Sequence, residues 1–262
     1  MKYAVTGATG FVGNRVAEIL RSRNHRVIAI VRNPPKAAAL KDMGADIREG
    51  DITEKESMRE AMKGCDGIFH LAAWYKIGAR DTSPAYQVNV EGTRNILELM
   101  LELNIPKGVY TSTLAVNSDT GGNVYDESYR FKGKHLSVYD RTKAKAHDIA
   151  LRFIDEGLPL VILMPGLIYG PGGTSLTDKS LRLYLQKKLP VVPAKTAFCW
   201  AHVVDIADIH VTAMEEADAG KTYIVGGPVH TVTDAFSVAE KVTGISRPRS
   251  LPPFLLKAAS YP

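Results

Sequence analysis

Short runs of β-branched and other apolar residues alternate with longer amphipathic stretches through the first two thirds of the chain. The short runs are typical of strands, and the amphipathic stretches are typical of helices that cover a sheet. The runs predict strands at residues 2–6, 27–31, 45–48, 67–71, 108–112 and 160–163. The stretches predict helices that include residues 12–23, 54–63, 88–103 and 137–156.

Strands and helices in alternation favour a parallel sheet that is covered on both faces. Residues 27–31 and 160–163 are apolar at consecutive positions, as expected for strands with both faces buried. We therefore predict an α/β fold of the Rossmann type, with a doubly wound parallel sheet and a small mixed C-terminal substrate cap.

Glycine and proline accumulate between residues 165 and 173, and the pattern beyond them is shorter and less regular. We predict a dinucleotide-binding core at residues 1–165, joined by returning segments from the C-terminal half. Residues 166–262 are predicted to form the smaller substrate cap. A new apolar stretch begins at Phe254, shortly before the chain ends, so we expect the cap to be truncated.

The composition of the 262 residues, 45% hydrophobic and 23% charged, argues against disorder, collagen and a coiled-coil rod. Lys plus Arg is 33 and Asp plus Glu is 28, so the net charge is +5, and the charges are scattered. Nucleic-acid binding is therefore not expected. The longest apolar run, residues 158–165, is too short to span a bilayer. Cys65 and Cys199 are the only cysteines, which favours the reducing cytoplasm.

Three glycines follow the first predicted strand and lead into the first predicted helix. Gly7 allows a tight turn, Gly10 lets the main chain approach a pyrophosphate, and Gly13 lets helix and strand pack closely. The helix N-terminus then directs free N–H groups at the phosphates. This position favours a dinucleotide site over the alternative, a plain strand-to-helix turn. The neighbouring residues included in the predicted site are Thr9, Phe11 and Val12.

The second predicted strand ends in a cation where a ribose-binding carboxylate is expected. No Asp or Glu occurs between Glu18 and Asp42, whereas Arg32 ends the strand and Lys36 follows one turn later. A guanidinium suits the 2′-phosphate of NADP, so we predict NADP over NAD. The alternatives are that Arg32 stacks on adenine or is only a solvated surface residue. The remaining predicted cofactor contacts are Asp51 and Ile52 for adenine, Ala72 and Ala73 for the central part, and Pro165.

Tyr139 and Lys143 lie four positions apart in a predicted helix and therefore share one face. A lysine ammonium beside a phenol favours the phenolate, so we expect the pKa of Tyr139 to be lowered toward neutrality. Tyr139 is then a candidate acid or base, and Lys143 can reach a nicotinamide ribose. Taken alone, this spacing also fits a surface pair. At the end of the fifth strand, Ser112 or Thr113 could hydrogen-bond the substrate oxygen.

Together these motifs resemble those of the extended short-chain dehydrogenase/reductases, over residues 1 to 245. The glycine loop matches T-G-x-x-G-x-x-G, and Tyr139 and Lys143 match Y-x-x-x-K. Other matches are the active-site hydroxyl Thr113, Y-G-P at residues 169–171, H-V-x-D at residues 202–205, and Asn89. The resemblance implies a nicotinamide cofactor and a catalytic set made of Thr113, Tyr139, Lys143 and Asn89.

Three features favour one branch of that family. Sugar dehydratases carry Asp and Glu after the catalytic threonine, whereas Leu114 and Ala115 follow Thr113 here. Residues 163–168 are apolar and lack the Arg and Asn that bind a substrate diphosphate. With Arg32, these features favour the dihydroflavonol-reductase-like branch, which reduces ketones and aldehydes. Five aromatic residues are candidates to line an apolar substrate pocket, and the alternative is that several of them are ordinary core or surface residues. The five are Trp74, Tyr75, Tyr125, Tyr129 and Phe131.

We therefore predict an NADP-dependent oxidoreductase that reduces a ketone or aldehyde of a small apolar substrate, or oxidises the alcohol. In this prediction Tyr139 donates the proton, while Lys143 tunes it and holds the ribose. Thr113 orients the carbonyl, and Asn89 supports a water or the helix. The alternatives are a nucleotide-sugar 4-epimerase with tightly bound NAD and a non-catalytic nucleotide-sensing protein.

A homodimer without metal completes the prediction. Family members often pair the helices that correspond to residues 88–103 and 137–156, although core packing explains their apolar faces equally well. Four residues are considered as metal ligands: His202, Asp205, Asp208 and His210. We do not predict a metal site, because their spacing is poor and a helix cap is favoured. A small-molecule substrate is the other expected partner, with neither nucleic acid nor membrane.

Overall fold

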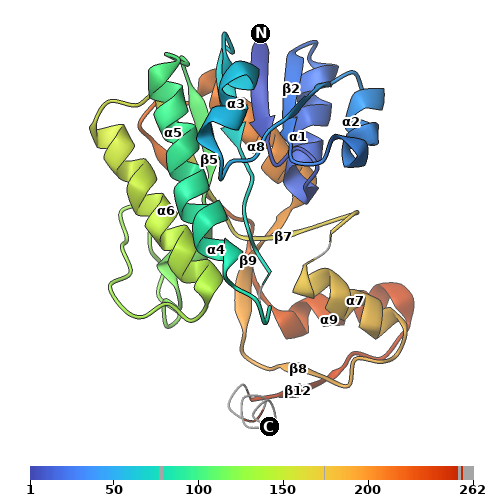
Figure 1. Cartoon of the computed structure of the whole chain (residues 1–262). Coiled ribbons are helices and arrows are strands. Elements are labelled where there is room, and N and C mark those ends of the chain that lie inside the picture. The colour runs from blue at the N-terminus through green and yellow to red at the C-terminus, as the bar shows by residue number, and fades with distance from the viewer. Residues whose placement is uncertain (77–78, 174, 253–254, 256–262) are drawn as a thin grey trace. The chain divides into compact units, whose positions relative to one another are not determined.

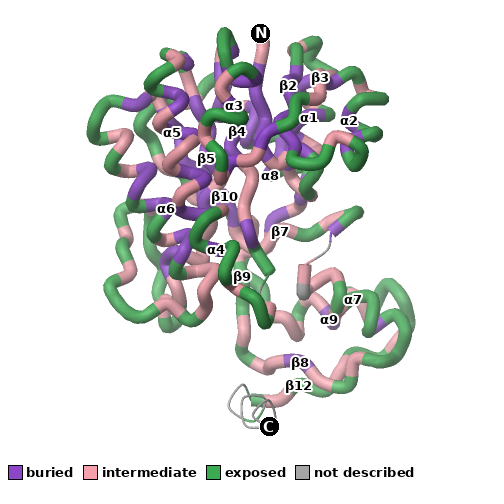
Figure 2. Tube along the Cα trace, viewed as in Figure 1, coloured by how far each residue is buried: buried purple, intermediate pink, exposed green. Residues whose placement is uncertain are grey.

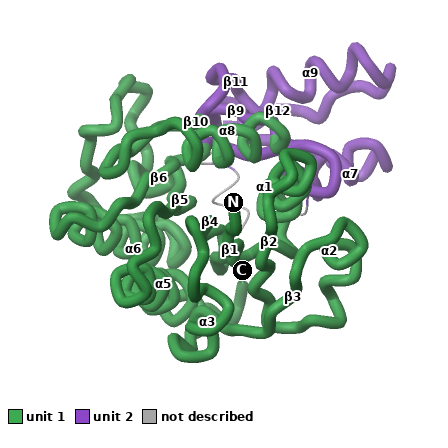
Figure 3. The backbone as a smooth tube through the Cα atoms, turned by 90° about the horizontal axis from the view of Figure 1, so that it is seen from above, with its two compact units in different colours: residues 1–165, 203–225 green, residues 166–202, 226–262 purple. Residues whose placement is uncertain are grey.

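The computed structural model describes residues 1–76, 79–173, 175–252 and 255 (Figure 1). The chain divides into two compact units, each built from two segments (Figure 3). The first unit contains residues 1–165 and 203–225, and the second contains residues 166–202 and 226–262. The final residues of the chain, on which the expectation of truncation rests, lie outside the described part.

A parallel sheet forms the centre of the first unit, with the strand order β10-β6-β5-β4-β1-β2-β3. Its strands are β1 (Lys2–Thr6), β2 (Arg26–Val31), β3 (Asp46–Glu49), β4 (Gly67–His70), β5 (Gly108–Thr111), β6 (Leu160–Pro165) and β10 (Thr222–Val225). The order reverses between β1 and β4, where Thr6 pairs with His70. In open parallel sheets, ligands bind outside the carboxyl ends of the strands at such a point.

Helices cover both faces of this sheet (Figures 1 and 3). On one face, α1 (Phe11–Ser22) packs against α8 (Val203–Glu216). The other face carries α3 (Lys55–Met62), α5 (Gly92–Glu102) and α6 (Val138–Asp155). The shorter elements are η1 (Pro34–Ala37), α2 (Ala38–Asp42), α4 (Pro84–Tyr86), the π-helical η2 (Gln87–Glu91) and η3 (Leu114–Asn117). The predicted doubly wound parallel sheet is confirmed.

The core lies where the strands with consecutive apolar residues predict it. Every residue of β6 is buried, and so is every residue of β2 after Arg26. Leu97 of α5 and Ile149 of α6 belong to one hydrophobic cluster with Ile162 of β6. Figure 2 shows this buried layer along the sheet and the inner sides of its helices. Burial of each such side chain contributes about 1.5–3 kcal/mol to the free energy of folding. The strand ends that carry the site therefore extend from a stable core.

The described part of the second unit contains small sheets and two helices. One sheet has the order β11-β9-β7, and the other pairs β12 with β8. Its elements are β7 (Leu167–Tyr169), α7 (Leu176–Leu185), β8 (Val191–Pro193), β9 (Ala197–His202), β11 (Val229–Thr231), α9 (Val232–Thr243) and β12 (Arg249–Leu251). Tyr184, Val192 and Phe236 form its small apolar core. Over the described residues of the whole chain, no helix has the length and apolarity needed to cross a membrane.

Candidate active site

The glycine loop between β1 and α1 packs against the chain that follows β4. Gly7 has a φ of +72°, which residues with a Cβ rarely adopt. A Cβ on Gly7 would lie 2.7 Å from the main-chain N of Ala72, and one on Gly13 would lie 2.2 Å from the Gly7 carbonyl oxygen. Both positions therefore require glycine, while Thr9 lies exposed in the same loop.

The first turn of α1 offers main-chain donors to an anion. The Gly10 N–H donates to the Gly7 carbonyl at 2.8 Å, and α1 then begins at Phe11. In the described structure no side chain caps this end of the helix. The N–H groups of Phe11, Val12 and Gly13 have no partner within the helix, as in any first turn. An uncapped first turn beside a glycine cradle fits the pyrophosphate of a dinucleotide.

Two cations stand beyond the carboxyl end of β2. Arg32 directly follows the strand, Lys36 lies in η1, and both are exposed. Among the residues that the structure describes, neither makes an ion pair, whereas Arg23 and Arg59 each bind two carboxylates. Both cations are therefore available to a phosphate group.

The turn after β3 contains the residues predicted to contact adenine. The Asp51 carboxylate accepts the N–H of Thr53 at 2.9 Å and its hydroxyl at 2.8 Å, so it shapes the turn. The Ile52 side chain is buried in the main hydrophobic cluster. A ligand at this turn would therefore meet the main chain of Ile52 rather than its side chain.

The predicted contacts after β4 and β6 lie at the same edge of the sheet as the glycine loop, because all these strands are parallel. Ala72 and Ala73 follow β4 and are half-buried. The Ala72 N–H donates to the Thr6 hydroxyl at 3.4 Å, which connects this segment to the end of β1. Pro165 is buried at the last position of β6, where it pairs with Val225 of β10.

Tyr139 lies in the first turn of α6, where a capping box sets the start of the helix. The Asp140 N–H donates to the Ser137 hydroxyl at 3.1 Å, and the Ser137 N–H donates to the Asp140 carboxylate at 3.1 Å. The Tyr139 side chain lies close to the side chain of Thr113, the residue before η3. The Thr113 side-chain oxygen accepts the N–H of Ala115 at 3.2 Å. The structure thus brings the predicted tyrosine and threonine together.

Burial raises the pKa of Tyr139 to about 12, against the lowering effect of the Thr113 hydrogen bond and with a further rise from the Asp140 carboxylate. The sequence predicts the opposite, a pKa lowered by Lys143. That prediction is wrong because desolvation dominates and the Lys143 ammonium is bound to other groups. Tyr139 is therefore a protonated phenol at neutral pH.

Lys143 is only 2% exposed. Its Nζ donates to the Tyr110 hydroxyl at 2.9 Å and to the Thr111 carbonyl at 2.8 Å. Burial lowers the pKa of Lys143 to about 7. Sequence reasoning did not assign Tyr110 to the site. The available signal was its position, a polar aromatic residue near the end of a buried strand and just before the predicted hydroxyls.

Asn89 lies in the π-helical turn η2 and connects two segments. Its Oδ1 accepts the Trp74 N–H at 2.7 Å, and its Nδ2 donates to the Trp74 carbonyl at 2.9 Å and to the Thr142 hydroxyl at 3.0 Å. These bonds use the amide oxygen and both amide protons. Of the two roles predicted for Asn89, support of a water or of the helix, these contacts supply the second.

The aromatic residues considered for a substrate pocket lie in different surroundings. Trp74 is buried, and Tyr75 is exposed. Tyr125 and Tyr129 stack with ring centres 3.9 Å apart. Phe131 packs against His135 with ring centres 5.1 Å apart. The last three belong to the segment between η3 and α6.

Among the described residues, no three His, Cys, Asp or Glu side chains lie close enough to hold a metal ion. His210 is fully buried, with its Nε2 accepting from the Thr111 hydroxyl at 2.8 Å and its Nδ1 donating to the Ile206 carbonyl at 2.7 Å. Burial lowers the pKa of His210 to about 4, so it is neutral. Asp208 pairs with Arg23 at 2.7 Å. These contacts explain both side chains without a metal.

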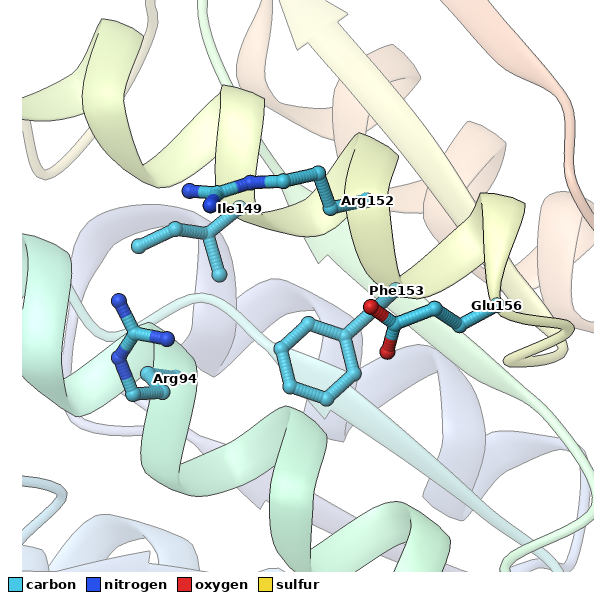
Figure 4. Close-up of a pocket in the computed structure, with 5 residues that line it drawn as sticks. All are labelled: Arg94, Ile149, Arg152, Phe153 and Glu156. Carbon is cyan, nitrogen blue, oxygen red and sulfur yellow. The ribbon is translucent and has the colours of Figure 1, made fainter.

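Surface cavities occur along α6. One of about 200 Å³ is lined by Arg94 of α5, by Ile149, Arg152 and Phe153 of α6, and by Glu156, which directly follows α6 (Figure 4). Another, of about 600 Å³, is rich in basic side chains and includes Lys132, Lys134, His135, Arg141, Lys145 and Asp148 in its lining. None of the predicted catalytic residues lines either cavity.

Comparison with known proteins identifies the family. The model of the NAD dependent epimerase/dehydratase family matches residues 3–226, and the chain belongs to this family. It is 30% identical to a putative dihydroflavonol 4-reductase of Synechocystis, over 97% of this chain and 76% of that one. It is 31% identical to a 2-alkyl-3-oxoalkanoate reductase of Stenotrophomonas maltophilia, over 86% of this chain and 70% of that one. The crystal structure of gox2253, also 30% identical, matches with a TM-score of 0.89 over 98% of this chain and 80% of that one.

The chain is accordingly an NAD(P)-dependent oxidoreductase of the short-chain dehydrogenase/reductase superfamily, whose members act on small molecules. The predicted resemblance to this family, and to its dihydroflavonol-reductase-like members, is confirmed. A nicotinamide dinucleotide fits the residues present, because the crowded glycine cradle and the uncapped first turn of α1 suit a pyrophosphate.

Proposed function

We propose that this chain is an NADP-dependent carbonyl reductase. It reduces a ketone or aldehyde of a small apolar substrate, or oxidises the corresponding alcohol. The observation that carries the proposal is that the side chains of Tyr139 and Thr113 lie close together, with Tyr139 one helical turn from the buried Lys143. A neutral phenol beside a second hydroxyl is suited to protonate an oxygen that gains negative charge.

When bound, the nicotinamide supplies the hydride that adds to the carbonyl carbon. Tyr139 gives its proton to the carbonyl oxygen as the π electrons of the C=O bond move onto that oxygen. The tyrosinate regains a proton from solvent. Thr113 hydrogen-bonds the carbonyl oxygen and orients it. Lys143 is held by Tyr110 and the Thr111 carbonyl, and its remaining N–H holds the ribose.

The preference for NADP rests on the charges beyond β2. Arg32 and Lys36 are exposed and make no ion pair within the described residues, so both are open to a 2′-phosphate. A guanidinium can bind such a phosphate through two parallel hydrogen bonds. Asp51, in the turn after the neighbouring strand β3, is held by Thr53, and within the described residues it makes no ion pair with Arg32 or Lys36.

A ketone is the proposed reacting group. One relative is named for a 2-alkyl-3-oxoalkanoate, whose 3-oxo group is a ketone. Leu114 and Ala115 follow Thr113 in this chain, so the site lacks at these positions the acid and base that would remove water from a sugar. Trp74, Tyr125 and Tyr129 are the aromatic residues proposed to contact the apolar part of the substrate.

A Tyr139→Phe variant tests the proposed function. The variant should lose nearly all reduction of a panel of ketones that includes a 3-oxoalkanoate ester, followed by the absorbance of NADPH, yet bind NADPH normally. Tyr3→Phe is the matched control, because Tyr3 is a buried tyrosine that packs on His25 and Phe69. Turnover by Tyr139→Phe at the rate of the control would refute the assignment.

The nucleotide that co-purifies with the chain separates the reductase from the epimerase alternative. An NADP-dependent reductase exchanges its nucleotide in every turnover, so the purified chain should be empty or hold NADP that exchanges freely. Mass spectrometry of the released nucleotide, followed by exchange with labelled NADP, measures this. Tightly held NAD that does not exchange would favour a nucleotide-sugar 4-epimerase.

We also propose a homodimer that forms through α5 and α6. Leu101 of α5 is 44% exposed, and the cavity shown in Figure 4 lies between the side chains of these two helices. Light scattering on the purified chain measures its mass. A Leu101→Glu variant should shift the mass toward that of the monomer.

A further inference from the structure

A line of buried polar side chains runs from β1 to α6. Thr6 Oγ1 lies 2.8 Å from His70 Nδ1, and His70 Nε2 lies 3.1 Å from Thr93 Oγ1. The Thr93 side chain lies close to the Tyr110 hydroxyl, which accepts from Lys143 Nζ at 2.9 Å. Each of these five residues is at most 2% exposed. The line is therefore closed to solvent, and its members come from β1, β4, α5, β5 and α6.

The direction of these hydrogen bonds follows from counting donors. An ammonium can only donate, so the Tyr110 oxygen accepts from Lys143, and the Tyr110 O–H is left to turn toward the nearby Thr93 side chain. His70 is neutral, because burial, with a smaller contribution from the charge of Lys143, lowers its pKa to about 3. A neutral imidazole has one donor and one acceptor, so His70 donates to one of the two threonines, Thr6 or Thr93, and accepts from the other.

The line leaves Lys143 with one unassigned donor. An ammonium has three N–H donors, and those of Lys143 include one to Tyr110 and one to the Thr111 carbonyl. Both acceptors are held in place. The His70 ring stacks on the Tyr110 ring with centres 5.4 Å apart, and the Thr111 hydroxyl donates to His210. The direction of the third N–H of Lys143 is thereby set.

We propose that Tyr110 is a positioning residue for the reaction, anchored through Thr93 and His70 to Thr6, the residue before the glycine loop. The inference rests on the proposed function, because it assumes that Lys143 takes part in it. Tyr110 acts through Lys143: its oxygen fixes the direction of the ammonium and favours the charged form. The strand that leads into the nucleotide loop is thus connected to the lysine through the hydrogen bond of His70 to Thr6, the stacking of His70 on Tyr110 and the hydrogen bond of Lys143 to Tyr110.

The charge of Lys143 depends on neutral oxygen acceptors. The titratable groups around it are His70 on β4, Tyr110 on β5, Tyr139 and His147 on α6, and His210 on α8 behind Thr111. Burial keeps the three histidines neutral, since their pKa values are lowered to about 3, 4 and 4. Burial also lowers the pKa of Lys143 to about 7, and no carboxylate of the described residues opposes that shift. Loss of one oxygen acceptor should lower it further.

A Tyr110→Phe variant of the full chain tests this role. The readout is the affinity for NADPH, measured by nucleotide fluorescence as a function of pH, which needs no identified substrate. In the wild type the affinity should fall as Lys143 loses its proton. In the variant this fall should begin about one pH unit lower, the equivalent of one hydrogen bond to a charged group. Turnover of the ketone panel should fall about tenfold, with the affinity for NADPH at low pH unchanged.

Two controls separate this role from general destabilisation. Tyr184→Phe also removes a buried hydroxyl, one that donates to the Ile245 carbonyl in the second unit, and should not move the pH profile. Thr93→Val removes the hydroxyl that binds His70 and lies next to the Tyr110 hydroxyl, and it should move the profile part of the way, whereas Thr93→Ser should restore it. This pair also tests the inference if Tyr110→Phe does not fold.

An unchanged pH profile in both Tyr110→Phe and Thr93→Val would overturn the inference, as would an equal shift in Tyr184→Phe. A Lys143→Met variant distinguishes this failure from failure of the proposed function. Full turnover by Lys143→Met would remove the proposed role of the lysine. Loss of turnover in Lys143→Met, with a wild-type pH profile in Tyr110→Phe, would leave that role intact and refute the positioning role of Tyr110 alone.

Discussion

Replacement of Gly13 by alanine tests how the glycine loop is built. The added Cβ would lie 2.2 Å from the Gly7 carbonyl oxygen, 2.8 Å from its carbon and 3.0 Å from the Cα of Ala8. Favourable contacts between heavy atoms begin at about 3.5 Å, so α1 and the loop must move apart by roughly 1 Å. All three atoms belong to the main chain, which cannot rotate away as a side chain can.

The structure sets the size of the expected effect. Overpacking of this kind lowers the free energy of unfolding by about 1–3 kcal/mol, and each kcal/mol lowers Tm by roughly 2–4 °C in a chain of this size. We expect a larger relative effect on the affinity for the nucleotide than on the free energy of unfolding. The Gly7 carbonyl accepts the Gly10 N–H at 2.8 Å, so a shift of Gly7 also moves the main chain that faces the phosphates. We expect the Kd for NADPH to rise about tenfold or more, which corresponds to about 1.4 kcal/mol per factor of ten.

Thermal unfolding and NADPH fluorescence titration measure the two effects separately. Gly157→Ala is the matched control, because Gly157 has a φ of +94° and a Cβ there would meet no atom within 4 Å. That change should cost about 1–2 kcal/mol through backbone strain and leave the Kd for NADPH unchanged. Wild-type affinity in Gly13→Ala, or an equal loss of affinity in Gly157→Ala, would refute the reasoning.

Three further outcomes are expected. Arg32→Ala should raise the Kd for NADPH roughly 10- to 100-fold in a fluorescence titration, because a charged hydrogen bond contributes about 1.5–3 kcal/mol, and should leave that for NADH unchanged. Asn89→Ala should lower the free energy of unfolding in urea by about 2–4 kcal/mol, because buried main-chain groups lose their partner. Stability in urea should fall as the pH drops below 6.5, because burial lowers the pKa values of His70, His147 and His210 to about 3, 4 and 4. The unfolded chain alone then binds these protons, and each histidine contributes at most about 1.4 kcal/mol per pH unit, so a flat profile would contradict the assignment.

The sheet could be predicted from the sequence because its signals are local. Consecutive apolar residues mark β2 and β6 as strands with two buried faces, and each is followed or preceded by an amphipathic helix. The strand β10 could not be predicted in the same way. It has four residues, only one of them buried, and its place is determined by pairing with β6, about 60 residues earlier in the chain.

In the candidate site, too, the parts with local sequence signals could be predicted and the others could not. The glycine loop and the pair of Tyr139 and Lys143 were visible because their spacing is local. The partner of the lysine was not, because Tyr110 lies 33 positions earlier and meets Lys143 only when α6 packs on β5. The wrong direction predicted for the pKa of Tyr139 has the same origin. A helical spacing places two side chains on one face, but burial and the other available acceptors decide which groups the ammonium binds.

The strand order places the two ends of the proposed dinucleotide site on opposite sides of the glycine loop, so substitutions at the two ends should act independently. β2 and β5 lie on opposite sides of the adjacent pair β1 and β4, and the glycine loop follows β1. A dinucleotide held at the glycine loop would extend its adenine ribose toward Arg32, after β2, and its nicotinamide toward Thr113, after β5. Arg32 shares no partner with the line that holds Lys143. The free-energy effects of Arg32→Ala and Tyr110→Phe on NADPH binding should therefore add, because distant residues without common contacts act independently.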